Sequence, residues 1–157
     1  MREITLWVLD KLVSITPSLL LRLFYSPKKV ASQVKVNLKG EKPVSPSLNS
    51  SVPHVDIYLE ITNLSNLDLV LDRMLIDLWV GQPVLVGTIL KRTKIPSRST
   101  GQQVFFRSNL SSKQVQQIEP FMSETPPAGS VTLSINAYLE SKVGIVEIEE
   151  RFERRRI

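Results

Sequence analysis

The sequence lacks cysteine altogether and contains a single histidine, His54. Without cysteine the chain can form no disulfide, no thiolate metal site and no cysteine nucleophile. One histidine also excludes metal sites built from several histidines, and a histidine-based catalytic triad would depend on a residue that directly follows Pro53. A glycine-rich phosphate loop and a nucleophile elbow are missing too. The sequence therefore predicts a protein that is not an enzyme and that binds no metal or cofactor.

Two polar patterns remain as candidates for chemistry, and each has a simpler structural explanation. Asp56 and Glu60 lie on one face of an expected strand and could act as an acid–base pair, although exposed carboxylates on a strand are usually only solvated. Three Asn-x-Ser triplets, which begin at Asn49, Asn63 and Asn109, could accept glycans in a secreted protein. Asn and Ser also concentrate in turns and helix caps, and we expect that role for all three triplets.

Length, composition and charge describe one folded domain with a preference for acidic partners. The chain has 157 residues, of which 42% are hydrophobic and 22% charged, as in ordinary globular proteins. Its net charge of +5 and its pI of about 9.6 favour nucleic acid or anionic lipid as a partner. The basic residues are scattered, however, and form no stripe interleaved with aromatic residues. We therefore expect no nucleic acid partner and favour anionic lipid.

An apolar segment interrupted by charge occupies residues 1–29. It is most apolar from Ile4 to Tyr25, where an amphipathic helical pattern places leucine and valine on one arc. The residues that interrupt it are Asp10, Lys11, Pro17 and Arg22. Each central charge opposes spanning by about 2.5–3.5 kcal/mol, and the charges fit a cleavable signal peptide badly. We expect an amphipathic segment that stays on the protein, divided into two short helices with Thr16 as the cap before Pro17.

This amphipathic segment is the predicted binding site. Trp7 and Tyr25 lie near its ends, where their rings favour a membrane interface, and the two lysines that follow could meet anionic head groups. The residues expected to contact a membrane or a partner are Trp7, Leu9, Leu12, Leu19, Leu20, Leu23, Phe24, Tyr25, Lys28 and Lys29. In the alternative interpretation, the same face packs on the domain's own sheet or on a partner protein. A membrane contact predicts a peripheral or singly anchored protein with its domain on the cytoplasmic side.

From residue 30 to residue 157 the pattern changes from helical periodicity to alternation. About seven strands are expected, at 30–38, 55–61, 72–80, 84–95, 102–108, 131–139 and 146–152. The loop 40–53 is long enough to cross between two sheets, and Gly87 is expected to mark a bulge. One internal helix is predicted from Ser111 to Met122, with a capping box from Ser111 to Gln114 and a limit near Pro120. The pattern predicts a mainly β, antiparallel, fibronectin-III-like sandwich.

Four stretches carry a family resemblance: VKVNL, DIYLEITNLSNLDLVLDRMLIDLWV, GQPVLVGTI and IPSRSTGQQVFF. Their order resembles the LEA-2 family, also called the water-stress and hypersensitive-response (WHy) domain or LEA14-like fold. The resemblance implies a fibronectin-like sandwich with one helix, a non-enzymatic role in desiccation or stress protection, and frequently a preceding membrane segment. The family commonly has Asn-Pro-Asn in its turn, whereas here Leu64 and Ser65 separate Asn63 from Asn66.

Two functions of different classes follow from these patterns. The first is a membrane-peripheral sandwich with a protective or lipid-binding role, anchored by residues 1–29. The second is a structural subunit of a larger assembly, docked through the same helix on a partner protein. A further prediction is an apolar cavity between the sheets that holds a lipid tail.

Overall fold

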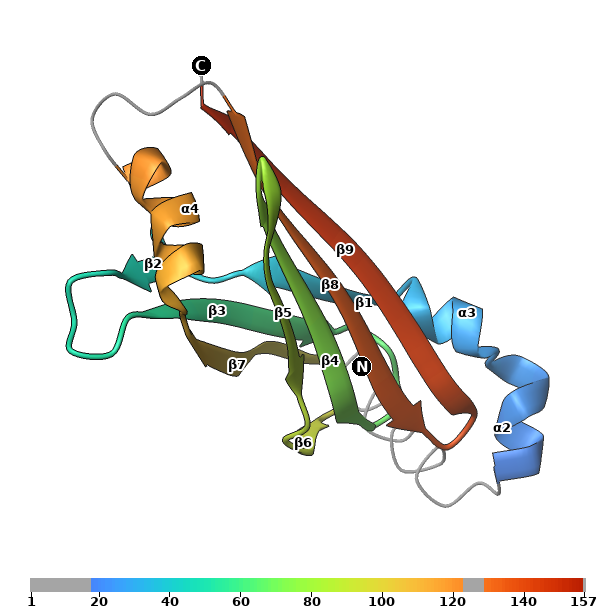
Figure 1. Cartoon of the computed structure of the whole chain (residues 1–157). Coiled ribbons are helices and arrows are strands. Elements are labelled where there is room, and N and C mark those ends of the chain that lie inside the picture. The colour runs from blue at the N-terminus through green and yellow to red at the C-terminus, as the bar shows by residue number, and fades with distance from the viewer. Residues whose placement is uncertain (1–17, 123–128, 157) are drawn as a thin grey trace.

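The computed structural model describes residues 18–122 and 129–156, which form two antiparallel β-sheets with short helices around them (Figure 1). The elements in chain order are α2 (Ser18–Phe24), α3 (Pro27–Ala31), β1 (Val34–Leu38), β2 (Val44–Ser47), β3 (His54–Asn63), β4 (Leu69–Val80), β5 (Gln82–Ile89), β6 (Thr93–Ile95), β7 (Ser99–Asn109), α4 (Ser112–Met122), β8 (Gly129–Ser141) and β9 (Gly144–Arg156). The predicted mainly β sandwich with a short internal helix is confirmed. Within the described ranges it has nine strands, more than the seven or so expected.

Each sheet is arranged around one long strand. In the first sheet, β1 and β2 pair with successive parts of one edge of β3, and β7 pairs with the other edge. The second sheet has the order β5-β4-β8-β9, and β6 pairs with the beginning of β4. The last two strands form the predicted hairpin, which is longer than expected because β8 pairs with β9 from Gly129 to Ser141.

The core lies between the two sheets and follows the predicted alternation. In β3 the side chains of Val55, Ile57, Leu59 and Ile61 are all fully buried. The second sheet contributes inward-facing residues of β4, β8 and β9 to the same cluster. Burial of these aliphatic faces removes apolar surface from water, which is the main stabilising contribution to such a fold.

A β-bulge explains why β4 begins earlier than predicted. The pairing between β4 and β8 shifts between Leu71 and Arg73, so Asp72 is an extra residue on β4. The bulge changes the phase of the alternation. Leu69 and Leu71 are therefore buried before it, and Met74 is buried after it. The sequence interpretation began this strand at Asp72 because strict alternation fails there.

The predicted strand 30–38 was wrong in its first residues, which belong to helix α3. Ser26 caps this helix, since its Oγ accepts a hydrogen bond from the Lys29 backbone N at 3.2 Å, and Pro27 occupies the first turn. Val30 is fully buried from its helical position. A single buried valine fits either a helix or a strand, so periodicity alone could not separate them.

The loop predicted at 40–53 contains a strand and does not cross between sheets. Strand β2 lies in it and pairs with β3, with Val44 opposite Ile57 and Pro46 opposite Val55. Both β1 and β2 pair with β3, so the chain stays in one sheet. Pro46 is tolerated because β2 is an edge strand, where one missing N–H breaks no continuous ladder.

The predicted strand 84–95 is two strands, and Gly87 does not mark a bulge. The chain leaves the sheet between Ile89 and Thr93. Gly87 pairs in register with Ile76. A Cβ atom at Gly87 would lie 2.2 Å from Phe106 Cζ, so this glycine leaves room for a ring from the opposite sheet.

Helix α4 has the predicted capping box. The Ser111 backbone N donates to Gln114 Oε1 at 2.8 Å, and the Gln114 backbone N donates to Ser111 Oγ at 3.4 Å. Gln114 Nε2 also donates to the Val84 carbonyl at 2.6 Å, which joins the helix to β5. The helix continues through Pro120 to Met122 and does not end near Glu119, because a proline so close to the end removes only one backbone hydrogen bond.

Candidate functional site

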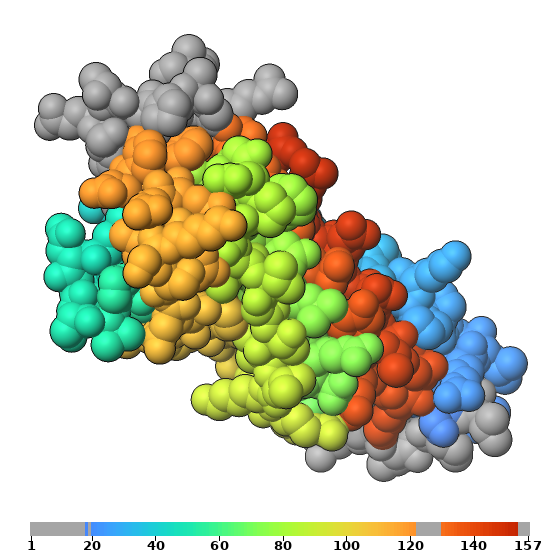
Figure 2. Space-filling model, in the orientation of Figure 1, coloured from blue at the N-terminus to red at the C-terminus, as the bar shows by residue number. Residues whose placement is uncertain are grey.

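The candidate binding site of the described chain is α2, which lies at one end of the molecule. Figure 2 shows α2 and α3, in blue, beside the red end of the sandwich formed by β9. Helix α2 ends at Phe24, and the Tyr25 backbone N donates to the Leu21 carbonyl at 2.8 Å. The two helices meet at Ser26, where the cap of α3 begins.

Two buried side chains hold α2 and α3 on the sandwich. Leu21 is 3% exposed and Val30 is fully buried, and both belong to the main core. Tyr25 adds a polar connection, because its hydroxyl accepts a hydrogen bond from Asn66 Nδ2 at 3.2 Å. Arg98 Nε in turn donates to Asn66 Oδ1 at 2.6 Å. The N-terminal helices are thus joined to the β3–β4 and β6–β7 turns.

Three other side chains of α2 are apolar and exposed to solvent. Leu20 is 50% exposed, Leu23 is 77% exposed and Phe24 is 70% exposed. We call these three residues the apolar tip. Lys28 and Lys29 are also exposed. Lys29 Nζ donates to the Phe24 carbonyl at 3.3 Å and lies 5.6 Å from the centre of the Tyr25 ring, so one cation is held beside the tip.

A further exposed apolar residue, Ile145, lies in the β8–β9 hairpin beside the start of α3, and it was not among the predicted contact residues. A Cβ atom at Gly144 would lie 3.8 Å from Pro27 Cγ, so the β8–β9 hairpin contacts the start of α3. Ile145, the next residue, is 65% exposed, and Lys142 in the same turn is exposed. The sequence pattern could have indicated this exposure, because Ile145 falls on the outward side of β9, where the other residues are mostly glutamates.

The predicted contact residues divide into three groups. Leu20, Leu23, Phe24, Lys28 and Lys29 are brought together at the surface, while Tyr25 is half-buried. Trp7, Leu9 and Leu12 lie outside the described residues, as does the Leu19 side chain. Among the helices that the structure describes, none has the length and apolar character needed to cross a membrane.

The Asn-x-Ser triplet at Asn63 is a buried turn. Asn63 Nδ2 donates to the Leu67 and Pro96 carbonyls, each at 2.9 Å. Its Oδ1 accepts from the Ser65 backbone N at 3.0 Å and from Ser65 Oγ at 2.7 Å. Asn63 is fully buried, so it has no access to a glycan-transferring enzyme in the folded protein. The triplet organises the β3–β4 turn and connects it to the β6–β7 turn.

Of the predicted acid–base pair Asp56 and Glu60, Asp56 forms a structural ion pair with Arg107. Arg107 Nε and Nη2 donate to the two oxygens of Asp56, each at 2.7 Å. This bidentate hydrogen bonding holds the pKa of Asp56 below its ordinary value of 3.8, against the opposing effect of burial. His54 Nδ1 donates to the Val52 carbonyl at 2.9 Å, and its Nε2 is 3.9 Å from Asp56 Oδ2, too far for a hydrogen bond. Asp56 is thus paired with Arg107 and not with Glu60.

In the described part of the chain, no group of three or more His, Cys, Asp or Glu residues is placed to bind a metal ion.

Comparisons with known proteins give information on the fold. No model of a known protein family matches the sequence, and no curated protein matches it. A solved structure described as "X-ray structure of Northeast Structural Genomics Consortium target SoR45" is similar at 14% identity and a TM-score of 0.50, over 81% of this chain and 89% of that chain. A "protein from Archaeoglobus fulgidus" has 11% identity and a TM-score of 0.46, over 79% of this chain and 97% of that chain. At such identities the similarity concerns the fold alone.

Proposed function

We propose that this chain is a non-enzymatic, membrane-associated β-sandwich protein that binds an anionic lipid surface through the apolar tip. The sandwich would remain in the aqueous phase on the cytoplasmic side. The observation that carries the proposal is the exposure of Leu20, Leu23 and Phe24 on a helix whose remaining described apolar residue, Leu21, is anchored in the core. Exposed leucine and phenylalanine on a short helix fit insertion into the head-group region of a bilayer.

Charge near the tip supports a lipid surface as its partner. Lys28 and Lys29 directly follow the tip, and near an anionic surface each contributes about 1 kcal/mol of attraction. Ile145 and Lys142 extend the same combination of apolar and basic groups onto the β8–β9 hairpin. A helix that lies in the interface would therefore gain from both burial and charge.

The protective part of the proposal comes from the resemblance to the LEA-2 family. A sandwich of two antiparallel sheets with the internal helix α4 agrees with the fold which that resemblance implies. We therefore propose that attachment places a stress-protective domain at a membrane surface.

Flotation with vesicles tests the membrane contact. We expect the full chain to float with vesicles of phosphatidylcholine and phosphatidylserine, and the triple variant Leu20→Ser, Leu23→Ser, Phe24→Ser to stay at the bottom of the gradient. A matched control is Val52→Ser, Val86→Ser, Leu90→Ser, because these apolar residues are also exposed but lie elsewhere. Replacement of Lys28 and Lys29 by glutamine should weaken binding by about 2 kcal/mol, roughly thirty-fold.

The alternative function is a structural subunit that docks through the same tip on a partner protein. Equal flotation of the wild type and the tip variant would reject the membrane proposal. A defined complex in lipid-free solution, which the tip variant loses in a mass measurement, would support the subunit.

A further inference from the structure

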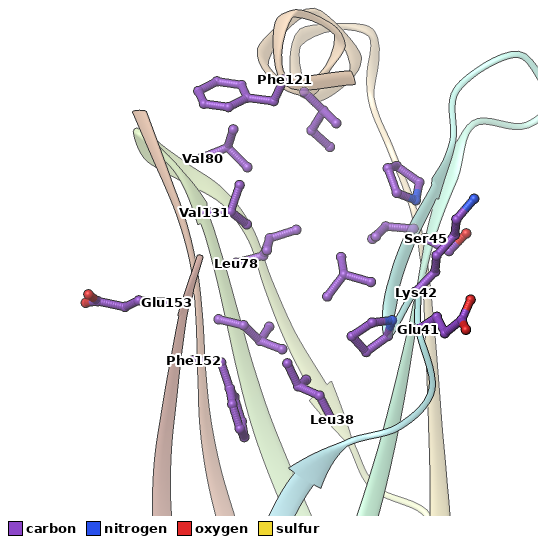
Figure 3. Close-up of a pocket in the computed structure, with 16 residues that line it drawn as sticks. Leu38, Glu41, Lys42, Ser45, Leu78, Val80, Phe121, Val131, Phe152 and Glu153 are labelled. Carbon is purple, nitrogen blue, oxygen red and sulfur yellow. The ribbon is translucent and has the colours of Figure 1, made fainter. Parts of the chain in front are cut away.

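An open cleft lies between the two sheets, at the end of the molecule opposite the apolar tip. It has a volume of about 720 Å³ and is bounded by β2 and the end of β1 on one side, by β4, β8 and β9 on the other, and by α4 across the end (Figure 3). The strands β2 and β9 are edge strands of their sheets. The cleft therefore occupies the side of the sandwich where the two sheets do not close on each other.

The side chains that point into the cleft are apolar. Leu78 and Val80 of β4, Val131 of β8 and Phe152 of β9 face the gap in Figure 3, and Phe121 of α4 lies at its end, with Cζ 3.9 Å from the position of a Cβ atom at Gly81. Val131, Phe152 and Phe121 are only partly buried although they pack against the core. These inward-facing side chains thus retain apolar surface that the sandwich itself does not cover.

The charged side chains at the cleft are directed away from its interior. In Figure 3 the carboxylates of Glu41 and Glu153 and the amine of Lys42 point outward from the two walls. Glu153 is also paired with Arg151, at 2.8 Å. The polar groups thus lie at the rim, and the labelled side chains in the interior offer no hydrogen-bonding partner.

Physical limits on size and polarity restrict what can fill the cleft. An α-helix with its side chains is about 10–12 Å wide, so it would need the walls to be further apart than packed sheets usually are, about 10 Å. A peptide strand could hydrogen-bond along the edge of β2 or of β9, but inside the cleft, among apolar side chains, its N–H and C=O groups would lack partners, which is unfavourable. A hydrocarbon chain has no such groups, and the cleft volume falls within the range of small-molecule sites, about 300–1,000 Å³.

We propose that this cleft binds a single hydrocarbon chain, such as that of a long-chain fatty acid, with its polar end in water at the rim. This site is separate from the apolar tip and goes beyond the membrane contact proposed above. Strand β8 connects the two places, since Val131 lines the cleft and Ser141 begins the turn that approaches α3.

Fluorescence titration of the delipidated full chain with cis-parinaric acid tests the proposal. We expect saturable binding of one molecule per chain, displaced by palmitate. Val44→Trp should weaken this binding at least ten-fold, because Val44 lines the cleft from β2 and a larger side chain would fill it. The matched control is Val86→Trp, which adds the same volume at a site that is 76% exposed, and it should bind as the wild type does.

Two further measurements keep the site distinct from the tip and independent of any one variant. The triple serine variant of the tip should bind parinaric acid unchanged, whatever the result of flotation. In the wild type, palmitate should shift the amide NMR signals of Val131, Phe152 and Phe121. Absence of saturable binding, equal affinity in Val44→Trp and Val86→Trp, or palmitate-induced shifts confined to α2 would each overturn the proposal.

Discussion

At the scale of single residues, Asn63 shows how one side chain can organise two turns. Its amide makes four hydrogen bonds, two as donor and two as acceptor, while the residue is fully buried. Aspartate could not supply the two donors, and serine could not reach both turns. The position therefore requires both the NH2 group and the carbonyl oxygen of an amide side chain. A buried polar group that loses its hydrogen-bonding partner lowers the stability of the fold.

Replacement of Asn63 by alanine tests this role. We expect Asn63→Ala to lower the free energy of unfolding by about 2–4 kcal/mol, because the buried Ser65 N–H loses its acceptor and the Leu67 and Pro96 carbonyls each lose one of their donors. Urea denaturation measures the change. Asn49→Ala is the matched control, since Asn49 also begins an Asn-x-Ser triplet but is exposed, and its effect should stay within about 0.5 kcal/mol. Equal effects of the two variants would contradict the role of Asn63.

At the scale of elements, α2 depends on the sandwich for its structure. It has seven residues, whereas isolated helices below about 12–15 residues are marginal in water. Its described contacts with the core are those of Leu21, supplemented by the hydrogen bond to Tyr25 that follows the helix. The helix is therefore held at the surface by few interactions while it exposes its apolar tip.

Hydrogen exchange can test this dependence with two neighbouring leucines. We expect Leu21→Ser to raise amide exchange throughout residues 18–24 while β3, β4 and β8 keep their protection, because the variant removes the buried anchor. Leu20→Ser changes the same residue type at a position that is 50% exposed, and it should leave exchange in the helix nearly unaltered. Unchanged exchange in Leu21→Ser would show that other contacts hold α2.

At the scale of the whole molecule, the sandwich is closed along one side, and the other side is open at the cleft but closed further along, where β1 and α3 contact β9. The closed side joins β7 of the first sheet to β5 of the second, where the Phe106 ring lies against Gly87. On the opposite side, β2 and β9 border the cleft. The contact between Phe106 and Gly87 thus helps to set the separation of the sheets along the closed side.

A double-mutant cycle can measure that contact. Gly87→Ala should destabilise the fold by about 1–3 kcal/mol, since the added Cβ would lie 2.2 Å from the present position of Phe106 Cζ. In the Phe106→Leu background the same change should cost much less, because the shorter side chain leaves room. Thermal unfolding of the four proteins gives the coupling free energy. Additive effects within about 0.5 kcal/mol would show that Phe106 moves aside freely.

Strict local patterns predicted much of this architecture. Alternation in β3, β8 and β9 and the capping box at Ser111 were sufficient to predict a sandwich with one internal helix. The patterns failed where tertiary contacts decide: at the Asp72 bulge, at Val30 in its short helix, and at Gly87, which is explained by a ring from another sheet. At the candidate site, Leu20, Leu23 and Phe24 are exposed and available for the predicted contact, which stays a prediction, whereas Ile145 was missed because it is distant in sequence.

The direction of β8 determines a distance between the two proposed sites. Val131 and Ser141 are ten positions apart on this strand, about 33 Å at the usual rise of 3.3 Å per residue. A chain that stands on a bilayer through its apolar tip, with β8 along the membrane normal, would hold the mouth of the cleft above the head groups by about the thickness of the hydrocarbon core. A hydrocarbon could then reach the cleft only from the aqueous side or from a second surface facing the first, and not by lateral movement out of the supporting bilayer.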